Sequence, residues 1–230
     1  MSYSNRVRTL KKIHFNGKAV LYWMVRDKRF NDNWALYIAQ RAAIKYKVPL
    51  HVCFQYNPKK SSGTLREYEF LFLGLKETVE SLIKHNIKFH LLNGDANIEI
   101  PTLCNLLKVG TLITDYSPLK LYKRRLNQVM SSLDCSIYQV DAHNIIPVWK
   151  TSDKKEFAAH TIRKKINRLL DDYLVEIPKA VVHPFGDVKK NKTNWNELID
   201  NLEIDRTVKS VNWINPGESS ALKRLNYLKS

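Results

Sequence analysis

Charged and amide side chains crowd together at the point where an apolar stretch of the sequence ends. Residues 19–24 read AVLYWM, and the block RDKRFNDN at 26–33 follows almost at once. Carboxylates and amides can bind the polar edges of a ligand, and cations can bind an anionic group. The same side chains can also cap the helix that follows or pair with one another, so the block allows both a ligand site and a purely structural role.

Three further polar clusters follow apolar stretches later in the sequence. They lie at Asn93-Gly94-Asp95, at Asp115-Tyr116-Ser117 and at 141–144. Each follows a short stretch rich in β-branched and aromatic residues, which is typical of a buried strand. Strands are predicted over 18–25, 49–56, 87–94, from 111 onward, and over 136–141.

Amphipathic, helix-like stretches separate the predicted strands. Their apolar residues recur at helical spacing over 34–46, 66–86, 98–108 and 119–133. Because parallel neighbours need a helical crossover, the alternation predicts an α/β fold, a Rossmann-like five-stranded parallel sheet with helices on both faces. The ligand crevice of such sheets lies at the carboxyl ends of the strands, where the polar clusters fall.

The pattern changes after residue 141, and four regions are predicted along the chain. They are a basic, loosely ordered lead-in at 1–17, the α/β domain at 18–150, a helix and a Pro-, Gly- and Lys-rich linker at 151–192, and the start of a helical domain at 193–230. Ser152 or Asp153 is the expected cap of the helix in the third region, with Glu156 at capping-box distance from Asp153.

The chain carries a large excess of positive charge. Thirty-eight Lys and Arg against 22 Asp and Glu leave a formal charge of +16 in 230 residues. This balance favours a polyanionic partner, with nucleic acid ahead of an anionic membrane or an acidic protein. An AT-rich genome also favours lysine, so a lysine-rich surface that binds none of these partners would give the same composition.

Signals of several other protein classes are absent. No apolar run approaches the ~20 residues that span a bilayer, and no signal-peptide block follows the N-terminus, so we expect a cytoplasmic or nuclear protein, or one of the virion or host cytoplasm if it is viral. Cys53, Cys104 and Cys135 show no CxxC spacing, which predicts buried free thiols and no metal site. No P-loop, G-x-G-x-x-G, HExxH or GxSxG motif occurs, so the residues by themselves indicate no reaction and no catalytic group.

Several stretches together resemble one family. YWMVRDKRFNDNWAL at 22–36 is similar to the opening strand and loop of class II cyclobutane-pyrimidine-dimer photolyases, in the photolyase/cryptochrome family. Further stretches resemble other segments of the same family and occur in the family's order, up to residue 225. They are REYEFLFLGLKE, FHLLNGD, TDYSPLK and the pairing of VDAHNIIPVW with AAHTIRKKI. Val25, Lys120 and Val148 depart from the Ser, Arg and Cys that are usual in the family.

The resemblance implies a light-harvesting role for the α/β domain. Family members often bind an antenna chromophore there, a deazaflavin, a folate or a flavin, which passes excitation energy to FAD in a helical domain. The reduced FAD then splits a pyrimidine dimer that has been flipped out of DNA. By position, the residues expected to line the chromophore pocket are Met24, Arg26, Asp27, Asn33, Gly94, Asp95, Asp115 and Ser117. Each also has a structural alternative, such as fixing a loop, turning the chain or capping a helix.

The resemblance covers only the N-terminal half of the family pattern. FAD is therefore expected only with a helical half, on another chain or in sequence lost by truncation. Lys164, Lys165 and Arg168 are expected to contact the phosphates of UV-damaged DNA, with Lys189, Lys190 and Lys192 on the linker as further candidates. A solvated charged face is the alternative. Trp23, Trp34 and Trp149 are expected in the core or an interface.

Three functions remain open on this basis. The chain can be the antenna part of a photolyase that repairs DNA together with a separate flavin-bearing half. It can also be a stand-alone chromophore- or nucleotide-binding module without repair activity. The third alternative is an inactive remnant of a split gene, with an exposed apolar face that invites self-association.

Overall fold

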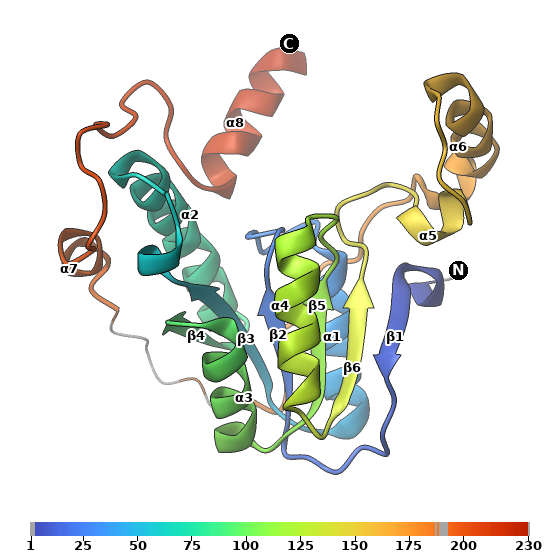
Figure 1. Cartoon of the computed structure of the whole chain (residues 1–230), viewed down its shortest axis with the longest axis horizontal. Helices are drawn as coiled ribbons and strands as arrows, with labels where there is room; N and C mark the ends of the chain where they lie inside the picture. The colour runs from blue at the N-terminus through green and yellow to red at the C-terminus, as the bar shows by residue number, and fades with distance from the viewer. Residues whose placement is uncertain (1–2, 187, 189–192, 230) are drawn as a thin grey trace.

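A six-stranded sheet organises the protein, in the strand order β1-β6-β5-β2-β3-β4 (Figure 1). Five of its strands are parallel neighbours: β2 (Ala19–Met24), β3 (Leu50–Tyr56), β4 (Lys88–Asn93), β5 (Val109–Asp115) and β6 (Ser136–Val140). The computed structural model describes residues 3–186, 188 and 193–229. The predicted α/β fold with five parallel strands is confirmed.

The sixth strand corrects the prediction of a loosely ordered lead-in. Residues 3–6 form the short helix η1 (Tyr3–Arg6), and β1 (Val7–Lys11) pairs antiparallel with β6. The sequence VRTLK mixes charged and apolar residues, and none of the five is buried. Charged side chains are common on edge strands, where they block pairing with other chains, so the basic character of this segment is compatible with a strand.

Helices cover both faces of the sheet, as predicted. On one face, α1 (Trp34–Tyr46) and α2 (Leu65–Lys84) share a buried apolar cluster with the sheet. On the other, α3 (Ala96–Leu107) and α4 (Lys120–Ser131) share a second cluster (Figure 1). Cys53, Cys104 and Cys135 are free thiols buried in this second cluster, and burial raises the pKa of each.

The tryptophans follow the sequence-based expectation of structural positions. Trp23 and Trp34 are buried on the two faces of the sheet. Trp149 packs edge-on against Tyr116 and donates its indole N–H to the carbonyl of Asn5 at 2.9 Å.

The helix after the sheet begins later than the capping pattern predicts. A short helix α5 (Val148–Thr151) comes first, and α6 (Ala159–Tyr173) starts with Ala158 at its N-cap. The Glu156 carboxylate accepts hydrogen bonds from Ser152 Oγ at 2.7 Å and from Lys165 Nζ at 2.6 Å. The predicted cap at Ser152 or Asp153 is therefore wrong, because Ser152 and Glu156 bind each other and Lys165 instead of the first turn of the helix.

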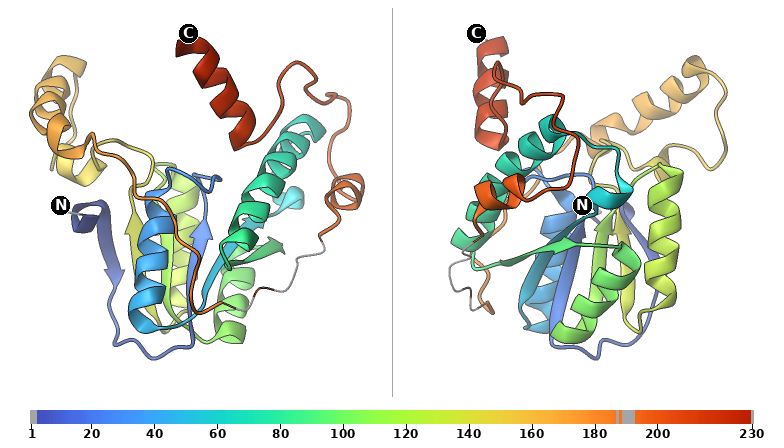
Figure 2. Two further views of the ribbon diagram at one scale, coloured as in Figure 1. Left: turned by 180° about the vertical axis from the view of Figure 1, so that it is seen from behind. Right: turned by 60° about the vertical axis from the view of Figure 1, so that its left-hand side comes forward.

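The predicted linker crosses α1 as an ordered segment, which Figure 2 shows from behind. The side chain of Gln40 donates to the carbonyl of Val181 at 2.7 Å and accepts from its N–H at 3.0 Å. His183 is completely buried, and Asn86 donates to the carbonyls of His183 and Gly186. We call residues 176–186 the strap. Lys189, Lys190 and Lys192 lie outside the described residues.

Two helices follow the strap on the α2 side of the molecule. In α7 (Trp195–Asp200), Trp195 and Ile199 join the same buried cluster as α2. α8 (Glu218–Lys229) has no buried residue, and Tyr227 and Leu228 are largely exposed. None of the helices among the described residues has the length and hydropathy of a membrane span.

Candidate functional site at the carboxyl edge of the sheet

A single buried carboxylate holds the loop that follows β2. Asp115, the last residue of β5, accepts hydrogen bonds from the backbone N–H groups of Val25 at 2.8 Å, Asp27 at 3.0 Å and Arg26. Tyr22 donates its hydroxyl to the same carboxylate at 3.3 Å. Burial raises the pKa of Asp115, while the three N–H donors favour its charged form. Asp115 therefore sets the path of the chain from β2 into residues 25–29.

Asn33 fixes the other end of this loop. Its Oδ1 accepts from the N–H of Leu36 at 3.0 Å and caps α1, as the sequence predicts. Its amide group donates to the carbonyls of Asp27 at 3.2 Å and Arg29 at 3.0 Å. Much of the polar block between β2 and α1 is therefore explained by a structural role, because its groups hold the loop and cap the helix.

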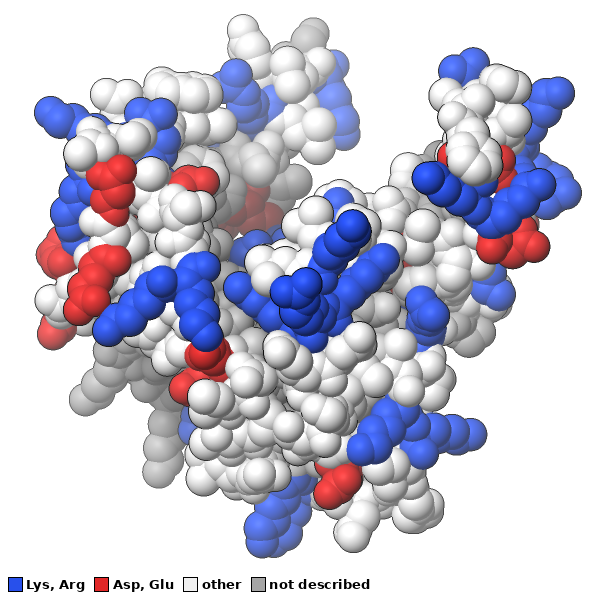
Figure 3. Space-filling view, in the orientation of Figure 1, with Lys and Arg blue, Asp and Glu red and all other residues white. Residues whose placement is uncertain are grey.

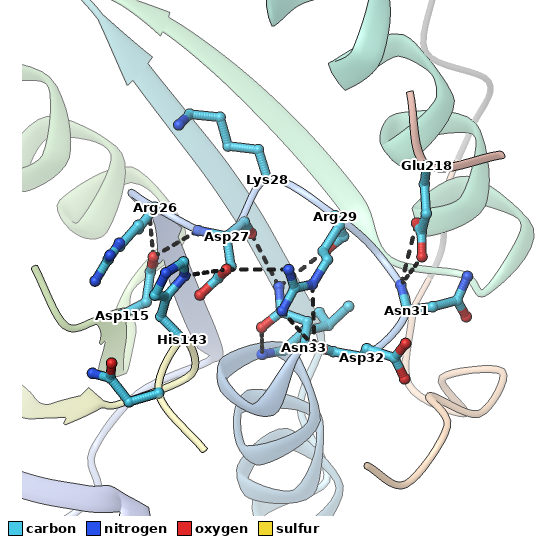
Figure 4. Close-up of polar contacts among 12 residues, drawn as sticks. Arg26, Asp27, Lys28, Arg29, Asn31, Asp32, Asn33, Asp115, His143 and Glu218 are labelled. Atoms are coloured by element: carbon cyan, nitrogen blue, oxygen red, sulfur yellow. Dashed lines mark hydrogen bonds and ion pairs between the residues drawn. The ribbon is translucent and has the colours of Figure 1, made fainter. Parts of the chain in front are cut away.

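Asp27 lies between two cationic or titratable side chains, as Figure 4 shows. Its Oδ1 is 3.3 Å from Nδ1 of His143 and 3.5 Å from a guanidinium nitrogen of Arg29. Asp27 is only 4% exposed, and its Oδ2 has no hydrogen-bond partner among the described residues. A donor placed there by a bound molecule would therefore stabilise the loop.

A cavity of about 390 Å³ opens beside this loop and is lined by residues at the end of β3, on α2 and on α4. Four aromatic residues, Phe54, Tyr56, Tyr68 and Tyr122, are among the residues that line it. Its cations are Lys28, Lys60 and Arg125. Burial lowers the pKa of Lys28, whose ammonium lies 5.6 Å from the centre of the Phe54 ring. A planar ring system with an anionic substituent suits such a lining, and the volume lies within the range usual for small-molecule sites.

None of the eight predicted pocket residues lines this cavity, and six of them fall into two groups. Arg26, Asp27, Asn33 and Asp115 lie together in and under the loop at 25–33. Asp95 binds Lys60 at 2.6 Å and Asn57 at 2.7 Å, and Gly94 accepts from the side chain of Gln55 at 2.5 Å. Asp95 and Gly94 therefore hold Lys60, Asn57 and Gln55, which do line the cavity.

Met24 and Ser117 are buried at the same edge of the sheet. Met24 is completely enclosed in the core, and Ser117 accepts a hydrogen bond from the N–H of Leu119 at 3.4 Å. Neither side chain presents a polar atom toward open solvent in this arrangement. Their contact with a chromophore stays a prediction.

Several residues that line the cavity follow β3, and the sequence pattern after this strand was not among the predicted polar clusters. Tyr56 and Asn57 close β3 and lead into a short helix η2 (Pro58–Lys60). The rule that polar residues after a parallel strand face the ligand crevice applies to this strand as well. Applied there, it would have selected Asn57 and Lys60. Tyr68 and Arg125 lie inside helices, and no short-range pattern marks them.

The three residues predicted to contact DNA occupy different environments on α6. Lys164 and Arg168 are exposed, one helical turn apart. Lys165 donates to Glu156 at 2.6 Å and to Ser152 at 2.9 Å. Lys165 holds the pKa of Glu156 near 2, well below its ordinary value. It is thus engaged within the protein, whereas the other two are available to a phosphate.

Comparison with known proteins gives consistent matches. The family model described as DNA photolyase matches residues 20–184. A protein named deoxyribodipyrimidine photo-lyase from Potorous tridactylus is 40% identical over 226 residues, which is 96% of this chain and 42% of that protein. One of the same name from Arabidopsis thaliana is 36% identical, over 96% of this chain and 47% of that protein. The chain thus spans less than half the length of these curated relatives.

The fold is also similar to that of a solved structure. A cryptochrome from Synechocystis sp. PCC6803 superimposes with a TM-score of 0.62 at 16% identity, over 91% of this chain and 45% of that one.

Proposed function

Because this chain belongs to the DNA photolyase family, we propose that it is the light-harvesting α/β part of a class II deoxyribodipyrimidine photolyase, which repairs cyclobutane pyrimidine dimers in DNA together with a flavin-bearing helical half. The observation that carries the proposal is the cavity at the carboxyl edge of the sheet, whose lining includes four aromatic residues and three cations. In this proposal the regions 18–150, 151–192 and 193–230 correspond to the antenna domain, the interdomain connection and the first part of the helical domain.

The cavity residues have distinct roles in this proposal. Tyr56, Tyr68 and Phe54 stack on the faces and edges of a deazaflavin, folate or flavin ring. Lys28 and Arg125 bind its anionic substituents. The chromophore, when bound, absorbs near-ultraviolet or blue light and passes the excitation energy to FAD. Asp95 and Gly94 position the cavity wall through Lys60, Asn57 and Gln55, and Asp115 positions the loop that carries Lys28.

The helical half supplies FAD in this proposal, on a second polypeptide or as further sequence of the same one. Exposed apolar side chains support a docking face: Trp213, Tyr227 and Leu228 near or on α8, and Phe157 before α6, are between 74% and 87% exposed. Burying such residues against a partner would be favourable. A second copy of the chain is the alternative occupant. UV-damaged DNA is the proposed substrate of the assembled enzyme, with Lys164 and Arg168 as phosphate contacts.

Absorption spectroscopy and a repair assay together test the proposal. The purified chain is mixed with 8-hydroxy-5-deazaflavin, a folate or riboflavin 5′-phosphate, and the bound fraction is identified by its absorbance above the protein band. The helical half of a class II photolyase with FAD is then added, and dimer repair is measured under light. We expect binding of one chromophore and light-dependent repair only in the mixture. Association with no repair, or no chromophore binding at all, would overturn the proposal.

A second candidate is a stand-alone chromophore- or nucleotide-binding module. It is favoured by one observation: every residue that lines the cavity lies between 28 and 125, so the cavity is complete within the α/β fold. Chromophore binding without association with any helical half would support this candidate. Absence of both would support an inactive remnant.

A further inference from the structure

Helix α4 carries a concentration of cations on its exposed side. Lys120, Lys123 and Arg124 are all exposed, and the helix sequence KLYKRRLNQVMS contains no acidic residue. In the described part of the chain, none of the three forms an ion pair. Figure 3 shows a group of Lys and Arg side chains over α4 in the middle of this face. We call these three residues the α4 basic face.

The local energetics of α4 disfavour this arrangement. Lys120 and Lys123 lie in and next to the first turn, where the partial positive charge of a helix N-terminus repels cations. Lys120 is also three and four residues away from Lys123 and Arg124, so like charges meet on one side of the helix. Neutral side chains at these positions would make a more stable helix. The fold therefore does not account for the three cations, whereas an anionic ligand would offset both repulsions.

The surroundings add further cations, although Glu67 also lines the neighbouring cavity. On the adjoining side of α4, Arg125 lies against the Tyr122 ring at 5.7 Å and faces the cavity that also contains Lys28. The nearby carboxylate of Asp95 is already bound to Lys60. By contrast, α6 pairs Lys165 with Glu156 and ends in Asp171 and Asp172. The α4 basic face is thus less compensated than the α6 cations that the sequence analysis selected.

We propose that the α4 basic face binds the phosphate backbone of nucleic acid, independently of base sequence and of dimer repair. Exposed cations that no carboxylate neutralises are the side chains that contact phosphates, and such contacts depend steeply on salt. A membrane surface fits less well. α4 packs Leu126 and Val129 into the core, and its exposed residue Leu121 does not by itself make a broad apolar side to insert between lipids.

The test compares two variants with equal loss of charge. K120Q/K123Q/R124Q removes the α4 basic face, and R41Q/K45Q/K76Q removes three exposed cations of α1 and α2. Binding of the full chain to undamaged single- and double-stranded oligonucleotides is measured in the dark by fluorescence anisotropy over a series of salt concentrations. We expect the α4 variant to bind about tenfold or more weakly at low salt, with the slope of log K against log salt reduced by about two to three. The α1/α2 variant should retain most of the wild-type affinity.

Further measurements distinguish loss of a binding site from loss of stability or of net charge. The α4 variant should melt at the same temperature as wild type or higher, because it removes helix repulsion, and K120R/K123R should retain binding. Equal losses in the α4 and α1/α2 variants would reduce the effect to net charge and overturn the inference. Binding to phosphatidylserine vesicles with none to DNA would also overturn it. Because the oligonucleotides carry no dimers and no light is used, a failure here is separate from a failure of the photolyase proposal.

Discussion

Nδ1 of His51 lies 2.9 Å from Nε2 of His90, across the neighbouring parallel strands β3 and β4. One ring donates this hydrogen bond and the other accepts it, so the contact requires a neutral acceptor ring. Burial is the largest cause that lowers the pKa of both rings to about 4, and the charge of Lys88 adds to it. His183 lowers the pKa of His51 further, and His51 lowers the pKa of His90.

This pair predicts a loss of stability between pH 6.5 and about 4. In that window the unfolded chain binds protons at ordinary histidines with a pKa of 6.5, whereas the folded pair does not until about pH 4. The free energy of unfolding therefore falls as the pH drops through the window, and it is fully retained above 6.5. Urea unfolding at several pH values measures this, and H51Q/H90Q should show a flatter pH dependence. An identical pH slope in wild type and variant would contradict the prediction.

Replacing Asp115 should be strongly destabilising. Asp115→Ala leaves the N–H groups of Val25, Arg26 and Asp27 without their acceptor at a buried position. Each such group costs about 1–3 kcal/mol, so a total loss of about 3 kcal/mol or more is expected. Asp134→Ala is the matched control, because Asp134 is fully exposed and its ion pair with Lys11 is 3.6 Å long. Its effect should stay within about 1 kcal/mol in the same urea titration.

The parallel sheet was predictable because the apolar stretches of β2 to β6 are bounded by turn residues and separated by helical patterns. β1 was not, since none of its side chains is buried and its strand conformation depends on pairing with β6, whose residues lie more than 100 positions away. The strap is a similar case. Its order comes from Gln40, Asn86 and the burial of His183, which a composition rich in Pro and Lys does not reveal.

The site was predictable in its location but not in its membership. Polar residues after the strands do gather at one edge of the sheet, because parallel strands end on the same side. Asp115 and Asp27 meet because β5 lies next to β2, a neighbour relation that spacing alone does not give. Met24 also stands at the end of a strand, and its side chain is buried in the core.

Lys28 should contribute measurably to chromophore binding. It is half-buried in the cavity wall, and a charge-assisted hydrogen bond from such a group is worth about 1.5–3 kcal/mol. Lys28→Gln is therefore expected to weaken binding of riboflavin 5′-phosphate by about tenfold or more, measured by fluorescence quenching. Lys76→Gln, on the exposed side of α2, removes the same charge and should leave the affinity unchanged. Equal affinities of wild type and Lys28→Gln would place the anionic group elsewhere.

Glu218 should control the attachment of α8 without controlling the stability of the fold. Its carboxylate accepts from the N–H groups of Phe30 at 3.1 Å and Asn31 at 3.0 Å, and Glu77 accepts from the N–H of Ser219 at 2.9 Å. Because α8 has no buried residue, these contacts supply much of what holds it. Glu218→Ala should accelerate amide exchange and proteolysis in 213–229 while the melting temperature changes little. Glu203→Ala, whose partner Lys59 is exposed, is the matched control. A cooperative drop in melting temperature for Glu218→Ala alone would show instead that α8 belongs to the folding unit of the sheet.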